Sequence, residues 1–332
     1  MVQSALPSRT APRLTRPAFS KLAGGMTLAT LLVVLFGAVV RITGSGAGCG
    51  QHWPSCNGEI AHLPRSVETW IELTHRTTSG LDFLGVVALV VVAWKRSPER
   101  PDPARLAALG ALLLMLVEVA IGARLVLLNL VGSNMSFDRA VVMPAHLVTT
   151  SLLLGALGAA TYFGSESRVT IDPAASARQL GAIKRAFFWL VLAGVLLLLV
   201  SMTGAVTALG DTVYPVQGSS TLEHLRNDRA EGAHFLAKLR VLHPLLALAG
   251  VASLWIAARR ARGAARAVLV QRLGALLHWG GALALAIGVA NIWLGAPGYM
   301  QVVHLAMACM LWLDAVVLGC ALWDAQAFRK EE

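Results

Sequence analysis

The chain has 332 residues, of which 56% are hydrophobic and only 14% are charged. Soluble domains carry about a quarter charged residues, so this composition excludes an ordinary soluble protein and predicts one that crosses a membrane several times. The formal net charge of +10 would also suit a nucleic-acid-binding protein. The basic residues lie between apolar segments, however, which argues against nucleic acid and indicates a signal that sets membrane topology.

Eight apolar segments of about the length needed to cross a bilayer as helices follow one another along the chain. They lie at about 26–43, 72–94, 105–128, 141–163, 183–208, 236–258, 270–295 and 299–322. Most of the 28 Lys and Arg residues fall in the two tails and in alternate loops. The positive-inside rule therefore predicts an all-α polytopic membrane protein with both termini in the cytoplasm.

The N-terminal tail, residues 1–25, contains four basic residues and no acidic one. No convincing small-residue cleavage site ends the apolar segment that follows it. We therefore expect an uncleaved cytoplasmic tail and a retained first helix.

The first outer loop, "GSGAGCGQHWPSCNG", contains Cys49 and Cys56. Outside the cytoplasm, two cysteines at this spacing favour a disulfide or a redox-active pair. Two reduced thiols, or half of a zinc site completed by His52 and His62, are the alternatives. Cys309 and Cys320, in the last apolar segment, are expected to be packing residues.

The second apolar segment begins with polar residues, in "IELTHRTTSGLD" (71–82). Ionisable groups at membrane depth are costly and usually functional. Glu72 lies one helical turn before His75 and four residues before Arg76. It can form a surface ion pair with Arg76, or it can act as a carboxylate beside a reactive centre that stabilises positive charge or accepts a proton.

The chain contains an internal duplication. The first helix ends in "GAVVRITGSGAG" (37–48) and the fifth in "GAVTALGDTVYP" (204–215), and His75 and His243 follow these stretches at nearly equal distances. This repeat predicts two tandem four-helix bundles, 26–163 and 183–322, related by an axis along the membrane normal. A cytoplasmic linker, 164–182, joins the bundles, and a tail, 323–332, follows the second.

Four histidines lie near the outer ends of the four even-numbered helices: His75, His146, His243 and His304. A lone histidine on an apolar helix is usually a packing residue, and four could also form a proton relay. Two facing histidines in each bundle instead suit bis-axial ligation of a haem iron. We therefore predict one haem site in each half, toward the outer face of the membrane. Zinc or copper is less suited, because only His75 has a carboxylate close to it in the sequence.

The two halves differ in their carboxylates. No acidic residue precedes His243, where the sequence reads "LAKLRVLH", whereas Glu72 precedes His75. This asymmetry indicates a reactive site in the first half and an electron-transfer or structural haem in the second.

Other charged residues lie within the apolar segments. Arg41 and Arg124 can pair with haem propionates or extend to the membrane interface. Glu118, Asp82 and Asp314 are either part of a proton path or hydrogen-bonding groups of the bundle, and the sequence does not distinguish these roles.

Two stretches resemble the haem A synthase family, membrane enzymes of cytochrome oxidase assembly. They are "RITGSGAGCGQHWPSCNG" (41–58) and "IELTHRTTSGL" (71–81), together with the histidines of helices 4, 6 and 8. The resemblance extends over about 26–322. It implies a bacterial cytoplasmic membrane, or a mitochondrial inner membrane in a eukaryote, with both termini on the cytoplasmic or matrix side. Some members carry a second cysteine pair in the third outer loop, which this chain lacks.

The resemblance implies that the C8 methyl group of haem O is oxidised through hydroxymethyl haem to the formyl group of haem A. It implies that His75 and His146 bind the substrate haem O and that His243 and His304 bind a haem b cofactor. It makes Glu72 the catalytic carboxylate and gives Cys49 and Cys56 a redox or structural role.

Several partners follow from this reading: the farnesyltransferase that produces haem O, cytochrome oxidase assembly factors, an electron acceptor that the residues do not identify, and a second copy of the chain. Two other functions use the same histidines. A two-haem b-type electron carrier needs neither Glu72 nor the cysteine pair, and a haem-handling or transport protein needs no chemistry.

Overall fold

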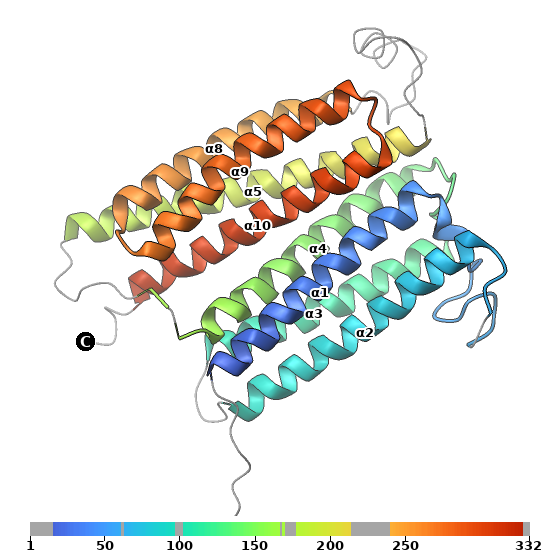
Figure 1. The fold of residues 1–332 in the computed structure, drawn as a ribbon, viewed down its shortest axis with the longest axis horizontal. Coiled ribbons are helices and arrows are strands. Elements are labelled where there is room, and N and C mark those ends of the chain that lie inside the picture. Colours follow the sequence, from blue (N-terminus) through green and yellow to red (C-terminus); the bar gives the residue numbers. More distant parts are fainter. Residues whose placement is uncertain are drawn as a thin grey trace, which may run out of the picture.

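The computed structural model describes residues 16–60, 63–96, 102–166, 168–169, 177–213 and 240–327. Apart from one isolated bridge between Cys56 and Glu59, regular structure in these ranges is helical (Figure 1). The elements are α1 (Arg16–Ile42), the 3-10 helix η1 (Ser45–Ala47), α2 (Val67–Arg96), α3 (Pro103–Leu127), α4 (Phe137–Gly164), α5 (Ala177–Val213), α8 (Leu242–Ala264), α9 (Val268–Trp293) and α10 (Gly298–Ala327).

Eight helices in the described part of the chain are long and apolar enough to cross a membrane. Many of their large apolar side chains face outward; Leu28 and Leu32 of α1, for example, each remain 57% exposed. Such a surface is stable in lipid and would be a liability in water. The prediction of an all-α, eight-helix integral membrane protein is therefore confirmed.

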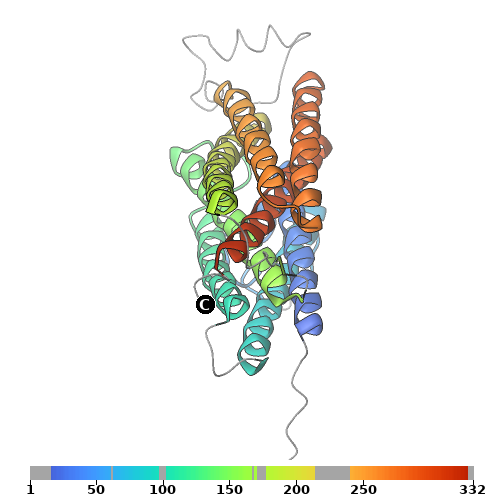
Figure 2. The ribbon, with the colours of Figure 1, turned by 90° about the vertical axis from the view of Figure 1, so that its left-hand side faces the viewer.

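The helices form two four-helix bundles. In the first, each helix of the ring α1–α2–α3–α4 packs against the next, and α4 closes the ring against α1. In the second, α5, α8, α9 and α10 close a ring in the same way. The bundles lie side by side in Figure 1, and the perpendicular view of Figure 2 shows the same division. This is the tandem arrangement that the duplication predicts.

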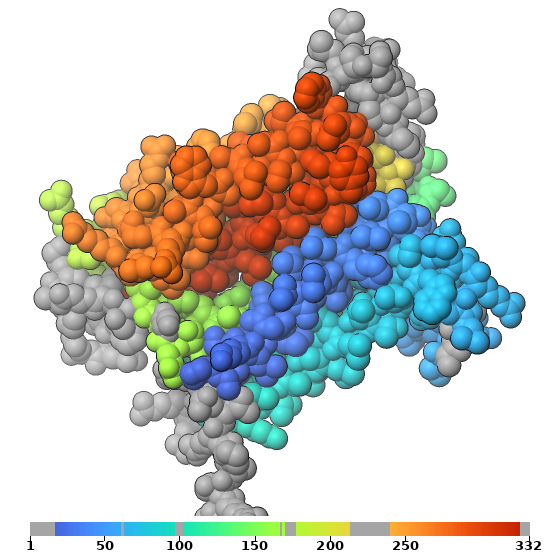
Figure 3. All heavy atoms as spheres, viewed as in Figure 1, coloured from blue at the N-terminus to red at the C-terminus, as the bar shows by residue number. Residues whose placement is uncertain are grey.

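The bundles meet through α4 and α1 of the first and α10 and α5 of the second. Figure 3 shows α1 against α10 along this face. Two glycines of α4 permit the close approach: a Cβ at Gly155 would lie 3.0 Å from the indole nitrogen of Trp312, and one at Gly158 would lie 3.0 Å from Leu313. Asp324 of α10 ties the two bundles at the opposite end from the histidines, since it accepts hydrogen bonds from Tyr162 and Arg168.

Helix ends differ from the predicted ones, most clearly in α1. The helix begins at Arg16, well before residue 26, so residues 16–25 of the predicted tail are helical. Pro17 suits the first turn of a helix, and Phe19 and Ala23 are fully buried among residues of α2, α3 and α4. Packing therefore extends this helix beyond its lipid-facing stretch.

Several predicted segments fall partly outside the described residues. These are residues 1–15 of the tail, 167 and 170–176 of the linker, 214–239 of the third outer loop and 328–332 of the C-terminal tail. The sixth predicted helix, 236–258, corresponds to α8, which begins at Leu242 after a turn at 240–241.

Candidate functional site

The first outer loop is closed by a disulfide between Cys49 and Cys56. Both cysteines are buried. Backbone hydrogen bonds from Cys56 to Glu59 (3.0 Å) and from Asn57 to Cys49 (2.9 Å) complete the closed loop. The disulfide prediction thus agrees with the structure, and no cluster of three metal-ligating side chains occurs among the described residues. His62, proposed as an alternative zinc ligand, lies outside them.

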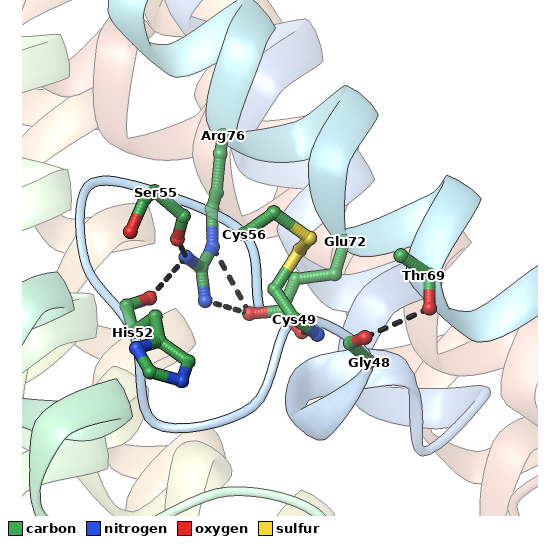
Figure 4. Close-up of polar contacts among 8 residues, drawn as sticks. All are labelled: Gly48, Cys49, His52, Ser55, Cys56, Thr69, Glu72 and Arg76. Atoms are coloured by element: carbon green, nitrogen blue, oxygen red, sulfur yellow. Dashed lines mark hydrogen bonds and ion pairs between the residues drawn. A yellow bond between two sulfur atoms is a disulfide. The ribbon is translucent and has the colours of Figure 1, made fainter. Parts of the chain in front are cut away.

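Glu72 and Arg76 of α2 hold this loop against the helix (Figure 4). The Glu72 Oε2 atom accepts a hydrogen bond of 2.7 Å from the backbone N–H of Cys49, and its Oε1 atom pairs with the guanidinium of Arg76. Arg76 also donates to the carbonyl oxygens of His52 (2.5 Å) and Ser55 (2.7 Å). The ion pair left open by the sequence is therefore present, but it is buried and anchors a loop.

The loop approaches α2 very closely at Gly48. A Cβ there would lie 2.6 Å from the backbone carbonyl of Glu68, so only glycine fits. Thr69 adds a hydrogen bond of 2.8 Å to the Gly48 carbonyl. With 3% of its surface exposed, Glu72 is consequently shielded from solvent by the loop that it anchors. This enclosure is the low-dielectric setting in which a carboxylate interacts strongly with a nearby positive charge.

His75 lies one turn further along α2, inside the first bundle. Its imidazole packs over Gly37 of α1, where a Cβ would lie 3.2 Å from Cε1, and its ring is edge-on to Phe36 with 5.9 Å between the ring centroids. The buried Nδ1 atom has no hydrogen-bond partner among the described residues. A glycine beneath an imidazole with an unpartnered nitrogen is a setting that suits an axial ligand.

His146 of α4 lies in the same bundle, next to α3. Its Nδ1 atom lies 2.9 Å from Oε2 of Glu118 in α3. Glu118 is held in turn by Thr149 and by Thr150, whose Oγ1 lies 2.7 Å from Oε2. The structure thus places Glu118, whose role the sequence left open, directly beside a predicted ligand.

The second bundle contains the corresponding pair, His243 of α8 and His304 of α10. A Cβ at Gly204 of α5 would lie 3.0 Å from Cε1 of His243, and one at Gly288 of α9 would lie 3.2 Å from Cε1 of His304. His243 Nδ1 lies 3.1 Å from the carbonyl oxygen of Val200. Three of the four histidines therefore lie over a glycine of a neighbouring helix.

The spacing of the second pair fits one metal ion between the rings. The ring centroids of His243 and His304 are 6.2 Å apart and the ring planes are 89° apart. Two imidazoles that bind opposite faces of one metal through bonds of about 2 Å would have their centres roughly 6 Å apart. The residues of this bundle therefore fit an axially ligated haem.

The other intramembrane charges divide into partnered and unpartnered groups. Asp82 of α2 accepts hydrogen bonds from Thr30 of α1 at 2.8 and 3.1 Å, which suits a role within the bundle. Both carboxylate oxygens of Asp314 are buried without a hydrogen-bond partner among the described residues, and nothing in the structure explains this.

The two arginines proposed as propionate partners differ. Arg41 donates across the boundary between the halves, to the Ala208 carbonyl (2.8 Å), to Thr212 (2.6 Å) and to Gln301 (2.8 Å). Arg124 is exposed in the last turn of α3. Arg41 is thus placed to link the bundles at the histidine end of the molecule.

Comparison with known proteins gives one family. The family model described as "Cytochrome oxidase assembly protein" matches residues 20–316. A relative named "Protoheme IX farnesyltransferase", in two strains of Thermus thermophilus, is 43% identical over 318 residues, which cover 95% of this chain and 50% of the relative. This chain therefore spans about half the length of those relatives.

Shorter matches carry a different name. A "Heme A synthase" of an Exiguobacterium species is 39% identical over 100 residues, which cover 30% of this chain and 33% of the relative. A "Heme A synthase" of Bacillus cereus is 51% identical over 69 residues, which cover 21% of this chain and 22% of the relative.

Proposed function

Because this chain belongs to the family of cytochrome oxidase assembly proteins, we propose that it makes haem A by oxidising the C8 methyl group of haem O to a formyl group through hydroxymethyl haem. The observation that carries the proposal is the asymmetry of the duplicated histidine sites. Each bundle contains a histidine pair, and among the described residues only the first has a buried carboxylate, Glu72, anchored under a disulfide-closed loop one turn from a histidine.

The names of the relatives support this reading. The family match at 20–316 takes in most of the region that aligns with the Thermus thermophilus relatives. The aligned half of those longer proteins therefore has the character of an oxidase assembly protein, and we assign the farnesyltransferase name to the other half. An enzyme that produces haem O is accordingly the partner that we propose for this chain.

The two histidine pairs take different roles. His75 and His146 bind the substrate haem O, and the glycine beneath His75 leaves room for the imidazole to turn toward it. His243 and His304 bind haem b, which supplies one-electron transfer when bound. Arg41 joins the bundles between these sites and keeps them at a fixed separation.

Glu72 has a catalytic role beyond its contacts with the loop. When the methyl carbon is oxidised, a C–H bond breaks, two electrons pass to an electron acceptor and a proton leaves, so positive charge develops at the carbon beside the porphyrin until the oxygen of a water molecule adds and releases a second proton. A preorganised carboxylate in a site shielded from water stabilises that charge and accepts the proton at a carboxylate oxygen. The disulfide loop excludes water, because Glu72 is almost completely covered.

The site faces the outer side of the membrane, and both termini are cytoplasmic. The distribution of basic residues supports this orientation. The disulfide also supports it, since disulfides persist outside the reducing cytoplasm.

A test is to produce the protein together with a haem O-forming farnesyltransferase and to identify the extracted haems by chromatography and mass spectrometry. We expect haem A, or haem O with a hydroxymethyl group, and neither in cells that lack the chain. Extracts that contain only unmodified haem O and haem B would contradict the proposal. They would favour a two-haem electron carrier, for which the histidine pairs suffice.

A further inference from the structure

Glu118 is the one acidic residue of α3 and lies in the apolar stretch between Arg105 and Arg124. A carboxylate at that depth is expensive unless it has partners and a use. The structure supplies three partners: the hydroxyl groups of Thr149 and Thr150, and the Nδ1 atom of His146 at 2.9 Å. All three belong to α4, so Glu118 points across the helix interface at one predicted ligand.

The second half shows what this position looks like without the carboxylate. The tripeptide "AIG" recurs at 120–122 in α3 and at 286–288 in α9, and this register places Ala284 where Glu118 lies. Neither His146 nor its counterpart His304 has a hydrogen bond to its buried Nδ1 atom among the described residues, but Nδ1 of His146 has a carboxylate oxygen 2.9 Å away. In the second bundle it is His243 whose Nδ1 meets an acceptor, the neutral carbonyl oxygen of Val200.

We propose that Glu118 is a positioning residue for His146: its carboxyl group holds the Nδ1 proton, so that Nε2 is the atom left to bind the iron of haem O. The inference rests on the proposed haem site of the first half. Histidines that bind metals usually donate their second N–H to a carboxylate or carbonyl, which fixes the tautomer and raises the basicity of the ligand. In this structure Nδ1 of His146 lies 2.9 Å from Oε2 of Glu118 without hydrogen-bond geometry, so the imidazole would have to turn slightly to donate to the carboxylate.

The contact between Glu118 and His146 also bears on the reduction potential of a haem bound in the first half. A more basic axial ligand stabilises ferric over ferrous iron, so the carboxylate lowers the reduction potential of the first-half haem. In the second half, Nδ1 of His243 lies beside the neutral carbonyl oxygen of Val200, which would lower the potential of a bound haem less than a carboxylate would.

Thr149 and Thr150 serve this arrangement by orienting the carboxylate. Thr150 contacts Oε2, the same oxygen that faces His146. Loss of the Thr150 hydroxyl therefore keeps the negative charge of Glu118 but leaves its carboxylate less firmly oriented toward His146.

The test uses the purified full chain loaded with haem, with the variants Glu118→Gln, Glu118→Ala and Thr150→Val. Asp82→Asn is the matched control, because Asp82 is also a buried carboxylate that accepts from a threonine of a neighbouring helix in the first bundle. Reduction potentials are measured by spectroscopic titration. The first-half component is identified as the one that disappears in the His75→Ala/His146→Ala double variant.

We expect Glu118→Ala to weaken haem binding in the first half by roughly tenfold to a hundredfold, the usual effect of losing such a partner. Glu118→Gln should retain more haem and shift only the first-half potential upward, with a smaller shift in Thr150→Val. Asp82→Asn should shift neither potential. If Glu118 serves packing alone, the Gln variant would match the wild type, and that result would overturn the proposal.

The readouts keep this inference separate from the proposed function. Shifted first-half potentials in a protein that makes no haem A would support the role of Glu118 and reject the enzyme. Haem A production with unchanged potentials in both Glu118 variants would support the enzyme and reject the role of Glu118. Absence of a first-half haem in the wild-type protein would overturn the role of Glu118.

Discussion

The two bundles share one scaffold and differ in the charges placed on it. Three residues before the outer histidine, the first half has Glu72 and the second has Arg240. Glu72 binds the disulfide loop, whereas Arg240 turns to the end of α5, where it donates to the Gly210 carbonyl (2.7 Å) and lies 3.1 Å from Asp211. The duplication thus preserves the positions of the histidines and reverses the charge beside them.

The same contrast holds deeper in the bundles. A carboxylate contacts one histidine of the first pair, and a backbone carbonyl contacts one histidine of the second. We infer that the histidine positions define where haem binds, and that the side chains around them define what happens to it. The predictions below test this division of labour.

The largest effect is expected at Glu72. Glu72→Ala should lower haem A formation by about 10²–10⁴-fold, the range for loss of a general acid or base, while both haems remain bound. Glu68→Ala is the matched control, because Glu68 is exposed in the first turn of the same helix. If the Glu72→Ala variant forms haem A near the wild-type rate, Glu72 anchors the loop and has no catalytic role.

The link between the halves is the next target. Arg41→Ala removes three hydrogen bonds that cross to α5 and α10. We expect a loss of stability of about 2–4 kcal/mol, because buried acceptors lose a charged donor, seen as earlier thermal loss of the haem spectrum in detergent. Arg124→Ala, at an exposed arginine, should change little. Equal loss of haem from both variants would instead support the assignment of both arginines to the propionates.

The disulfide loop is expected to matter less for chemistry than Glu72 does. Cys49→Ser/Cys56→Ser should cost about 2–3 kcal/mol, the usual scale for a disulfide, measured again by thermal loss of the haem spectrum. Haem A formation should fall by less than in Glu72→Ala, since the Cys49 N–H that binds Glu72 is retained. Complete loss of product in a folded double variant would indicate that the cysteine pair takes part in the redox chemistry.

Asp82 should show the smallest effect. In Asp82→Asn the amide oxygen still accepts from Thr30, so we expect a stability change below about 1 kcal/mol and unchanged product formation. A marked fall in haem A would place Asp82 in a proton path.

Much of the fold could be predicted from the sequence, because lipid allows few solutions: each long apolar segment must be a helix. The duplication paired the helices correctly, and the four histidines of the even-numbered helices lie inside the bundles. Helix ends could not be predicted in the same way. Hydropathy marks the lipid-facing stretch, while Phe19 and Ala23 extend α1 through packing against other helices.

The side-chain contacts of the site were harder to predict from the sequence. Glu118 and His146 meet across two helices, and Arg41 reaches partners in the other half of the chain. Sequence spacing carries no information on such rotations of one helix against another. One signal was present for Glu118: the repeated "AIG" shows that the second half has alanine where the first has a charge, which singles out the charge as special to the first site.

The most direct test of the account is the haem content of two purified double variants produced with haem O available. For His75→Ala/His146→Ala we predict haem b alone, with neither haem O nor haem A bound and no product formed. For His243→Ala/His304→Ala we predict bound haem O that is not converted to haem A. Haem O or haem A retained by the first variant, or haem A made by it, would contradict the assignment of the substrate site to the first half.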